Sequence, residues 1–164
     1  MRVPYRKPGK FSQMKPDPMM TEEKFNELKK EQEKLKRIRP HAAADVARLA
    51  ELGDFSENAE YQLAKGRLRG INNAIVRLEN QINQAEIIKP QRTDTVQLGS
   101  TVTIESASGQ KTYQILGSSE TDPERGIISH NSPLGVALVG KRVGEKVTVR
   151  LENREMIYKI IGIE

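Results

Sequence analysis

An apolar repeat in the middle of the chain places the strongest constraint on its fold. Seven apolar residues between positions 64 and 85 follow one another at alternating steps of four and three. Such a heptad repeat places all of them on one face of a helix that packs along a second helix. With a rise of about 1.5 Å per residue, a helix of roughly thirty residues would be about 45 Å long. The repeat consists of Ala64, Leu68, Ile71, Ile75, Leu78, Ile82 and Ala85.

The segment before this repeat supplies the expected partner helix. Thr21 can cap its start, and two acidic residues follow in the first turn, where negative charge meets the positive end of the helix dipole. Apolar residues recur along the segment, and Pro40 predicts a bend or a short break. The recurring positions are Phe25, Leu28, Leu35, Ile38, Ala42, Val46 and Leu49.

Little sequence separates the two helical segments. Only Leu52, Gly53 and Asp54 stand between them, and Gly53 can adopt the left-handed conformation that ends a helix. Two helices joined so closely fold back on each other. We therefore expect residues 20–88 to form a long antiparallel coiled-coil hairpin, a rod with an acidic tip at residues 53–61.

A different pattern begins after Lys89 and Pro90. The apolar period changes from about 3.5 to 2, and turn residues separate the segments, which is typical of β-strands. One short helix interrupts them, with Ser132 as its N-cap, Pro133 as its first residue and Gly140 as its end. The predicted fold class is α+β, with a small α+β domain at residues 89–164. Its strand candidates are residues 101–105, 111–116, 127–129, 146–151 and 155–163.

Composition limits the remaining possibilities. In a chain of 164 residues, 36% hydrophobic residues is low for a single well-filled core, which favours an elongated part. The absence of cysteine excludes disulfides, thiolate metal sites and a cysteine nucleophile. No apolar run approaches the roughly 20 residues of a membrane span, and the N-terminus lacks the apolar region of a signal peptide. We therefore expect a cytoplasmic protein with no membrane contact.

The basic charge of the chain is concentrated in its first 19 residues. This segment has a net charge of +4, whereas the remaining residues have 22 basic and 21 acidic side chains. Four of the eight prolines lie in it and no apolar periodicity is present, so we expect residues 1–19 to form a disordered tail. A solvated tail is favoured over a basic arm that grips nucleic acid.

The helical repeat meets acidic residues where it reaches the predicted turn. Extending it backwards from Ala64 reaches Tyr61, Glu57 and Asp54 in turn. Unpaired carboxylates are costly to bury between helices, so the interface must open there to water or to a partner. Asp54 can be an N-cap with Glu57 at the third helical position. Two carboxylates a helical turn apart also offer oxygen ligands to Mg²⁺, and the two interpretations are compatible.

Two motifs in the chain resemble those of a known family. Residues 53–61 read GDFSENAEY, which resembles the GDLSENAEY tip motif of the Gre transcript cleavage factors. Residues 126–135 (GIISHNSPLG) and 137–141 (ALVGK) resemble the C-terminal signature of the same family. The likeness extends over residues 20–163, since Met20-Thr21 and Arg39-Pro40 are similar to the family's helix start and mid-helix pair.

The resemblance implies a partner and a chemistry. The hairpin would enter the secondary channel of a bacterial RNA polymerase, while a C-terminal domain of FKBP-like fold docks at the channel rim. Asp54 and Glu57 would hold Mg²⁺ shared with the polymerase active site, and Glu60 and Tyr61 would support the tip. The polymerase itself would then cleave backtracked nascent RNA near its 3′ end. Such a factor is not an enzyme, binds no cofactor in isolation and takes no small-molecule substrate.

Contacts to RNA and to the polymerase surface are less sharply implied. Relatives commonly place a basic residue three positions before the tip glycine, where this chain has Ala50. For the nearest basic residues, a solvated helix face explains the pattern as well as RNA contact does. These are Arg48, Lys65, Arg67 and Arg69. Exposed apolar surface beside the implied docking loop is explained equally well by packing of the short helix. The docking candidates are Ser129, Asn131, Ser132 and Pro133.

Three rival functions stay open. The first is a channel-binding inhibitor of the same family, which Asp54 and Glu57 argue against and Ala50 leaves open. The second is a prolyl isomerase, suggested by the FKBP-like fold, but residues 89–164 hold only Tyr113 and Tyr158 as aromatics, few for an apolar substrate pocket. The third is a purely structural coiled coil, which gives no reason for acids at the turn.

Overall fold

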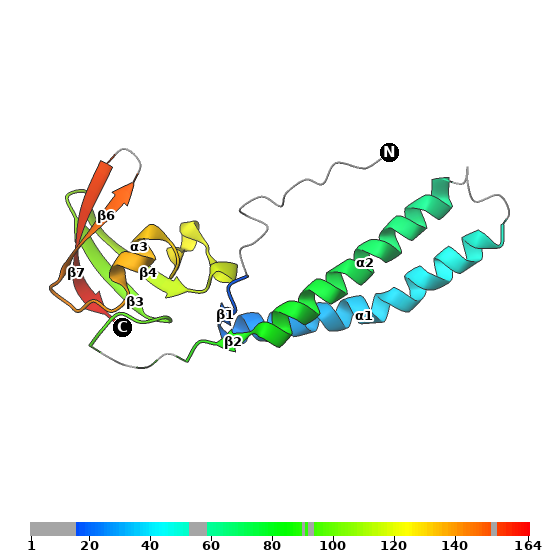
Figure 1. Cartoon of the computed structure of the whole chain (residues 1–164), viewed down its shortest axis with the longest axis horizontal. Coiled ribbons are helices and arrows are strands. Elements are labelled where there is room, and N and C mark those ends of the chain that lie inside the picture. Colours follow the sequence, from blue (N-terminus) through cyan, green and yellow to red (C-terminus); the bar gives the residue numbers. More distant parts are fainter. Residues whose placement is uncertain (1–15, 53–58, 90, 92–93, 152–153) are drawn as a thin grey trace, which may run out of the picture.

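The computed structural model of the chain describes residues 16–52, 59–89, 91, 94–151 and 154–164. Two long helices form a hairpin that extends away from a small domain of strands and one short α-helix (Figure 1). The predicted α+β class, with a helical hairpin followed by a small mixed domain, is confirmed. In the described ranges, no helix has a stretch that is long and apolar enough to cross a membrane.

The hairpin consists of α1 (Glu22–Ala50) and α2 (Ala59–Gln84). The side chain of Thr21 accepts a hydrogen bond from the Lys24 amide, as expected of the predicted N-cap. α1 continues through Pro40 as one helix, so the short break that Pro40 could cause does not occur. Leu35 and Ala42, on either side of Pro40, pack in the same apolar cluster, which holds both halves of α1 against α2.

The two helices pack through the apolar faces that the sequence predicts. Ile38 differs, because it remains 41% exposed while Ala42 and Leu35 pack against Ile71 and Ile75 of α2. An ion pair between Lys36 and Glu79, with Nζ and Oε1 3.0 Å apart, also joins the helices. The buried residues of the interface are Leu28, Ala42, Leu49, Ile71, Ile75 and Leu78.

Two short strands close the base of the hairpin. β1 (Met19–Met20) pairs in parallel with β2 (Glu86–Ile87), and the Ile88 amide donates to the Met20 carbonyl. Met20 is 3% exposed and packs with Leu28 and Leu78. The folded part therefore includes residues 16–19, which we assign to the tail from sequence; residues 1–15 lie outside the described ranges. A strand of two residues is too short to leave a periodic pattern.

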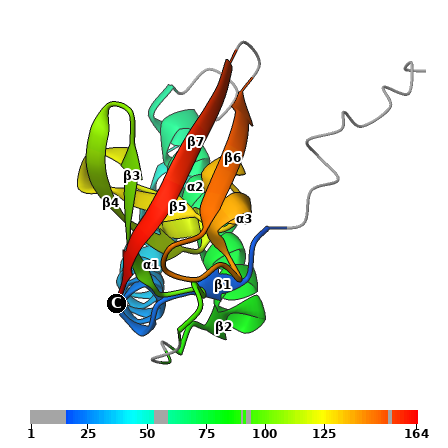
Figure 2. The ribbon, with the colours of Figure 1, turned by 90° about the vertical axis from the view of Figure 1, so that its left-hand side faces the viewer.

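The C-terminal domain is built on a five-stranded sheet with the order β5-β4-β3-β7-β6 (Figure 2). β5 is parallel to β4, and every other neighbouring pair is antiparallel. The strands agree with the sequence predictions to within two residues at each end. They are β3 (Thr101–Ser106), β4 (Gly109–Leu116), β5 (Ile127–Ser129), β6 (Lys146–Leu151) and β7 (Arg154–Ile163).

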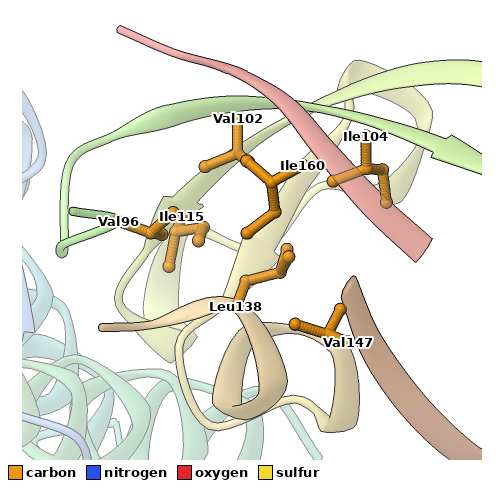
Figure 3. Packing of buried hydrophobic residues seen from close by; sticks show 7 residues of the cluster. All are labelled: Val96, Val102, Ile104, Ile115, Leu138, Val147 and Ile160. Atoms are coloured by element: carbon orange, nitrogen blue, oxygen red, sulfur yellow. The ribbon is translucent and has the colours of Figure 1, made fainter. Parts of the chain in front are cut away.

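Short helical segments connect these strands. Between β4 and β5 lie two 3₁₀ turns, η2 (Ser118–Glu120) and η3 (Pro123–Arg125). After β5 comes α3 (Pro133–Leu138), where the Ser132 side chain accepts from the Gly135 amide as the predicted N-cap. Leu138 of α3 is fully buried against the sheet (Figure 3). The core residues are Val96, Val102, Ile104, Ile115, Leu138, Val147 and Ile160.

Candidate functional site

The end of the hairpin remote from the C-terminal domain is the predicted site. α1 ends at Ala50, with Glu51 as its C-cap, and the described part of α2 begins at Ala59 (Figure 1). Residues 53–58 connect these ends in sequence, and their placement lies outside the described residues. The predicted roles of Asp54 and Glu57, as helix caps and as metal ligands, therefore stay predictions.

The helix interface opens beside this end. A hollow of about 260 Å³ lies between α1 and α2, with an apolar floor and charged side chains around it. Leu49 is the last buried residue of α1, whereas Leu63 of α2 is 73% exposed. The helix interface is therefore incompletely filled next to the tip, and the outward placement of the acids stays a prediction. The lining residues are Ala42, Asp45, Arg48, Leu49, Glu60, Leu63, Ala64 and Arg67.

Three predicted site residues line this hollow together. Arg48 comes from the last turn of α1, and Glu60 and Arg67 come from the first turns of α2. The Arg48 guanidinium is 3.9 Å from Asp45, and both side chains are more than half exposed, so their pairing is weak and screened. With two acids and two arginines, the hollow has balanced charge.

The other predicted residues near the tip are placed differently. The Lys65 ammonium lies 5.3 Å from the centroid of the Tyr61 ring, which suits a cation–π contact and supports one face of α2. Arg69 is exposed one turn further along α2. The structure thus brings together Arg48 and Arg67 from the predicted basic set, whereas Lys65 and Arg69 do not line the hollow.

Among the described residues, no group of three or more His, Cys, Asp or Glu side chains is placed to hold a metal ion. Glu60 is among the described residues, whereas Asp54 and Glu57 are not. Two carboxylates suit Mg²⁺ chemically, because this ion binds proteins through one or two carboxylates and takes its other ligands from water and phosphate. The predicted pair would therefore be an incomplete site that a partner completes.

The predicted docking loop lies in the C-terminal domain, beside α3 and next to the base of the hairpin. Ser129 is buried, and its hydroxyl accepts from the Asn131 amide. Ser132 caps α3, so these two serines shape the loop. Pro133 and Asn131 are exposed, and Val136 of α3 is 64% exposed. The short helix thus packs on the core through Leu138 and also presents apolar surface outward.

One group of contacts was missed by sequence reasoning. Asp17, which precedes β1, meets Ser118 and His130 of the C-terminal domain, with a carboxylate oxygen 2.9 Å from His130 Nε2. Burial raises the pKa of Asp17, but the hydrogen bonds from the Ser118 and Met19 amides, the Ser118 hydroxyl and His130 together leave it below its ordinary value. The missed signal was a single acid within a basic, proline-rich segment.

These features define a class of protein that carries a helical rod, with an acidic sequence between its two helices, and a compact α+β domain at the opposite end. Residues 18–87 match the N-terminal domain of transcription elongation factors, and residues 91–164 match the C-terminal domain of the GreA/GreB elongation factors. The chain belongs to the GreA/GreB transcription elongation factor family, as its two motifs predict.

The chain is similar to family members named GreA. It is 40% identical over 150 residues to transcription elongation factor GreA of Geobacillus kaustophilus, covering 88% of this chain and 95% of that protein. It is 36% identical over 148 residues to GreA of Nitratiruptor sp., covering 88% of this chain and 91% of the relative. A crystal structure of GreA factor homolog 1 of Thermus thermophilus is a weak structural match, with a TM-score of 0.41 and 23% identity over 88% of this chain and 97% of that one.

Proposed function

We propose that this protein is a transcription elongation factor that binds bacterial RNA polymerase through its secondary channel and stimulates the polymerase's own cleavage of backtracked nascent RNA. The observation that carries this proposal is the position of the GDFSENAEY sequence in a hairpin of the GreA/GreB family. It joins two helices of 29 and 26 residues, at the end remote from the C-terminal domain. A rod of that length suits delivery of a tip into a deep channel.

Asp54 and Glu57 are the residues proposed to hold Mg²⁺, jointly with the polymerase active site. When bound there, the ion would lower the pKa of the attacking water and stabilise the charge of the displaced oxygen. The two carboxylates would orient that site and supply negative charge, so the isolated protein would have no nuclease activity. Glu60 and Tyr61 lie in the first turn of α2 and would hold the tip in place.

Arg48 and Arg67 are the proposed contacts for RNA near its 3′ end. They line the same hollow beside the tip, and the weak pairing of Arg48 with Asp45 leaves its guanidinium available to a phosphate. A paired substitution to glutamine should weaken the dependence of cleavage on salt concentration, since it removes two phosphate contacts. Lys65 and Arg69 serve as comparison positions outside the hollow.

Docking is proposed to use the C-terminal domain, for which the family resemblance implies an FKBP-like fold. The exposed side chains of Asn131 and Pro133, together with Val136 of α3, form the candidate surface. Ser129 and Ser132 would act indirectly by shaping the loop. A factor that acts on RNA polymerase in this way would work in the cytoplasm.

The decisive experiment uses purified, backtracked RNA polymerase complexes carrying end-labelled RNA. The wild-type protein should accelerate transcript shortening, and Asp54→Ala or Glu57→Ala should reduce the rate to that of polymerase alone. Both variants should still bind polymerase, because docking is proposed to use the C-terminal domain, which is remote from the tip. Glu31→Gln, an exposed position on α1, is the matched control and should behave as wild type.

Other outcomes would distinguish the rival functions. Equal loss of elongation with wild type and with Asp54→Ala, without transcript shortening, would support a channel-binding inhibitor. Turnover of a proline-containing peptide by the wild type would favour a prolyl isomerase. Absence of polymerase binding would leave only a structural role for the hairpin.

A further inference from the structure

The segment before α1 is held against the C-terminal domain by a set of hydrogen bonds that converge on one carboxylate. Asp17 Oδ2 accepts from the Ser118 amide and from the Ser118 hydroxyl, each at 2.8 Å. The same oxygen lies 2.9 Å from His130 Nε2 and 3.4 Å from Asn131 Nδ2. The Asp17 side chain is only 9% exposed. Contacts of an ionised carboxylate with this many donors are stronger than neutral hydrogen bonds.

A second carboxylate reaches the start of α1 from the opposite direction. Glu120 of η2 accepts hydrogen bonds from both the amide and the hydroxyl of Thr21. Because Thr21 is also the N-cap of α1, Glu120 places negative charge beside the positive end of that helix. The hairpin and the domain thus hold each other through one acid from each side.

The two backbones are also in close contact at this point. A Cβ atom added to Gly117 would lie 1.8 Å from the Met19 carbonyl oxygen. No side chain larger than hydrogen fits there unless β1 moves away. We call Asp17, Thr21, Gly117, Ser118, Glu120 and His130 the junction clamp.

Asp17 lies directly before the part of the chain that matches the N-terminal family domain. The match to the N-terminal family domain begins at residue 18, one position later. Asp17 therefore comes from outside the matched region, whereas Ser118 and Asn131, which donate hydrogen bonds to it, lie inside the matched C-terminal domain.

We propose that Asp17 is a positioning residue, whose carboxylate fixes the direction of the hairpin relative to the C-terminal domain and so fixes where the tip points. The lever is long, since 29 residues of α1 extend about 43 Å from the junction. For a helix of this length, a rotation of about 10° at the junction would displace the tip by about 7 Å. A small change in the hairpin angle, caused by loss of the Asp17 contacts, would therefore move the tip by several ångströms.

The orientation can be measured directly in the full-length chain. The protein has no cysteine, so Lys34→Cys on α1 and Thr148→Cys on β6, both exposed, provide two unique sites for nitroxide labels. Pulsed electron paramagnetic resonance should give a narrow distance distribution for this pair. Adding Asp17→Asn, which keeps the side-chain shape and removes the charge, should broaden or shift the distribution by several ångströms. Glu31→Gln on α1 is the control and should leave it unchanged.

A second variant shows whether a changed distance reflects the junction itself and not a loss of folding. Gly117→Ala should broaden the same distribution from the other side of the junction, because its methyl group displaces β1. Circular dichroism should show unchanged helix content for both variants. If Asp17→Asn retains the wild-type distribution with both labels in place, Asp17 does not set the orientation and the proposal is wrong.

The consequence for cleavage rests on the proposed function. Asp17→Asn should lower the maximal rate of stimulated cleavage about tenfold at saturating factor, where any effect on docking through Asn131, which also contacts Asp17, no longer limits the rate. Broadened distances with an unchanged maximal rate would overturn the positioning role. Failure of the wild type to stimulate cleavage would refute the proposed function, and the distance measurement would still decide whether Asp17 orients the hairpin.

Discussion

At the scale of single residues, the ionisation of Asp17 connects the junction clamp to pH. Its pKa is lowered in the folded protein, because the donors around the carboxylate outweigh the effect of its burial. A group with a lowered folded pKa contributes stability above its unfolded pKa of about 3.9, and this contribution is lost as the pH falls through the folded value. His130 is the titratable side chain in contact with it.

The pH dependence can be isolated by comparing two proteins. Asp17→Asn should lower the free energy of unfolding by about 1–2 kcal/mol at pH 6, since it weakens hydrogen bonds to a charged acceptor. This difference should shrink as the pH falls below the unfolded pKa of about 3.9 and through the lowered folded pKa, and it should vanish once Asp17 is protonated in both states. Urea titrations of both proteins at each pH provide the measurement. A difference that does not shrink at all as the pH is lowered from about 3.9 would show that the Asp17 charge is not its source.

The close packing around Gly117 leads to a second prediction about stability, which does not involve charge. Gly117→Ala should lower the free energy of unfolding by about 1–3 kcal/mol, since the added methyl group meets the Met19 carbonyl. Ser119→Ala, at an exposed neighbouring position, should change it little. Thermal unfolding of the three proteins tests both statements, and equal midpoints for Gly117→Ala and wild type would contradict the close packing.

Single residues also show where sequence reasoning succeeds and fails. Asp54 and Glu57 can be recognised in the sequence because they continue a repeat, and Ser132 because it precedes a proline at a helix start. Asp17 has no such pattern: its partners are 101 and 113 positions away, and nothing in its neighbours specifies that distance. Local pattern predicts local structure, whereas contacts between distant segments need the assembled fold.

At the scale of elements, the two glycines of α2 have no packing role in the described structure. A Cβ atom at Gly66 or at Gly70 would have no neighbour within 4 Å, and neither has a positive φ angle. Both glycines lie inside the helix, where alanine is favoured by roughly 1 kcal/mol. They therefore lower the stability of α2 without a compensating contact.

Replacement of these glycines should stabilise the hairpin. Gly66→Ala and Gly70→Ala should each raise the free energy of unfolding by about 0.5–1 kcal/mol, and the double variant by about the sum. Circular dichroism during thermal unfolding measures this directly. Gly126→Ala is an instructive contrast, because its φ of 71° and a neighbour at 2.9 Å predict destabilisation instead. A loss of stability in the α2 variants would contradict the open surroundings.

Elements with many repeats of one pattern were predicted well, whereas the two-residue strands were not. α1 and α2 follow from long apolar repeats, and β3, β4, β6 and β7 from alternation over six or more residues. β1 and β2 have two residues each, so they leave no periodicity, although they close the base of the hairpin. Pro40 shows the opposite limit, where packing on both sides outweighs a local helix-breaking preference.

At the scale of the whole molecule, the proposed function depends on the distance between the tip and the docking surface. Leu35, Ile75 and Leu78 occupy matching stretches of α1 and α2, and the Lys36–Glu79 ion pair shows that these stretches lie side by side. Removing seven residues from each helix at this level would keep the heptad register. The rod would then be shorter by about 10 Å with both ends unchanged.

A protein without residues 32–38 and 73–79 should therefore remain folded and bind polymerase through its intact C-terminal domain. Its stimulated cleavage should fall at least about 100-fold, because catalytic groups act only when placed to within about an ångström. Asp54→Ala in the full-length chain gives the rate expected for complete loss of the tip. Polymerase binding, helix content and cleavage rate should be measured on the same preparations. A shortened rod that binds and still stimulates cleavage at the wild-type rate would show that the tip does not act by reaching a fixed point, and would remove the reason for a long hairpin in this mechanism.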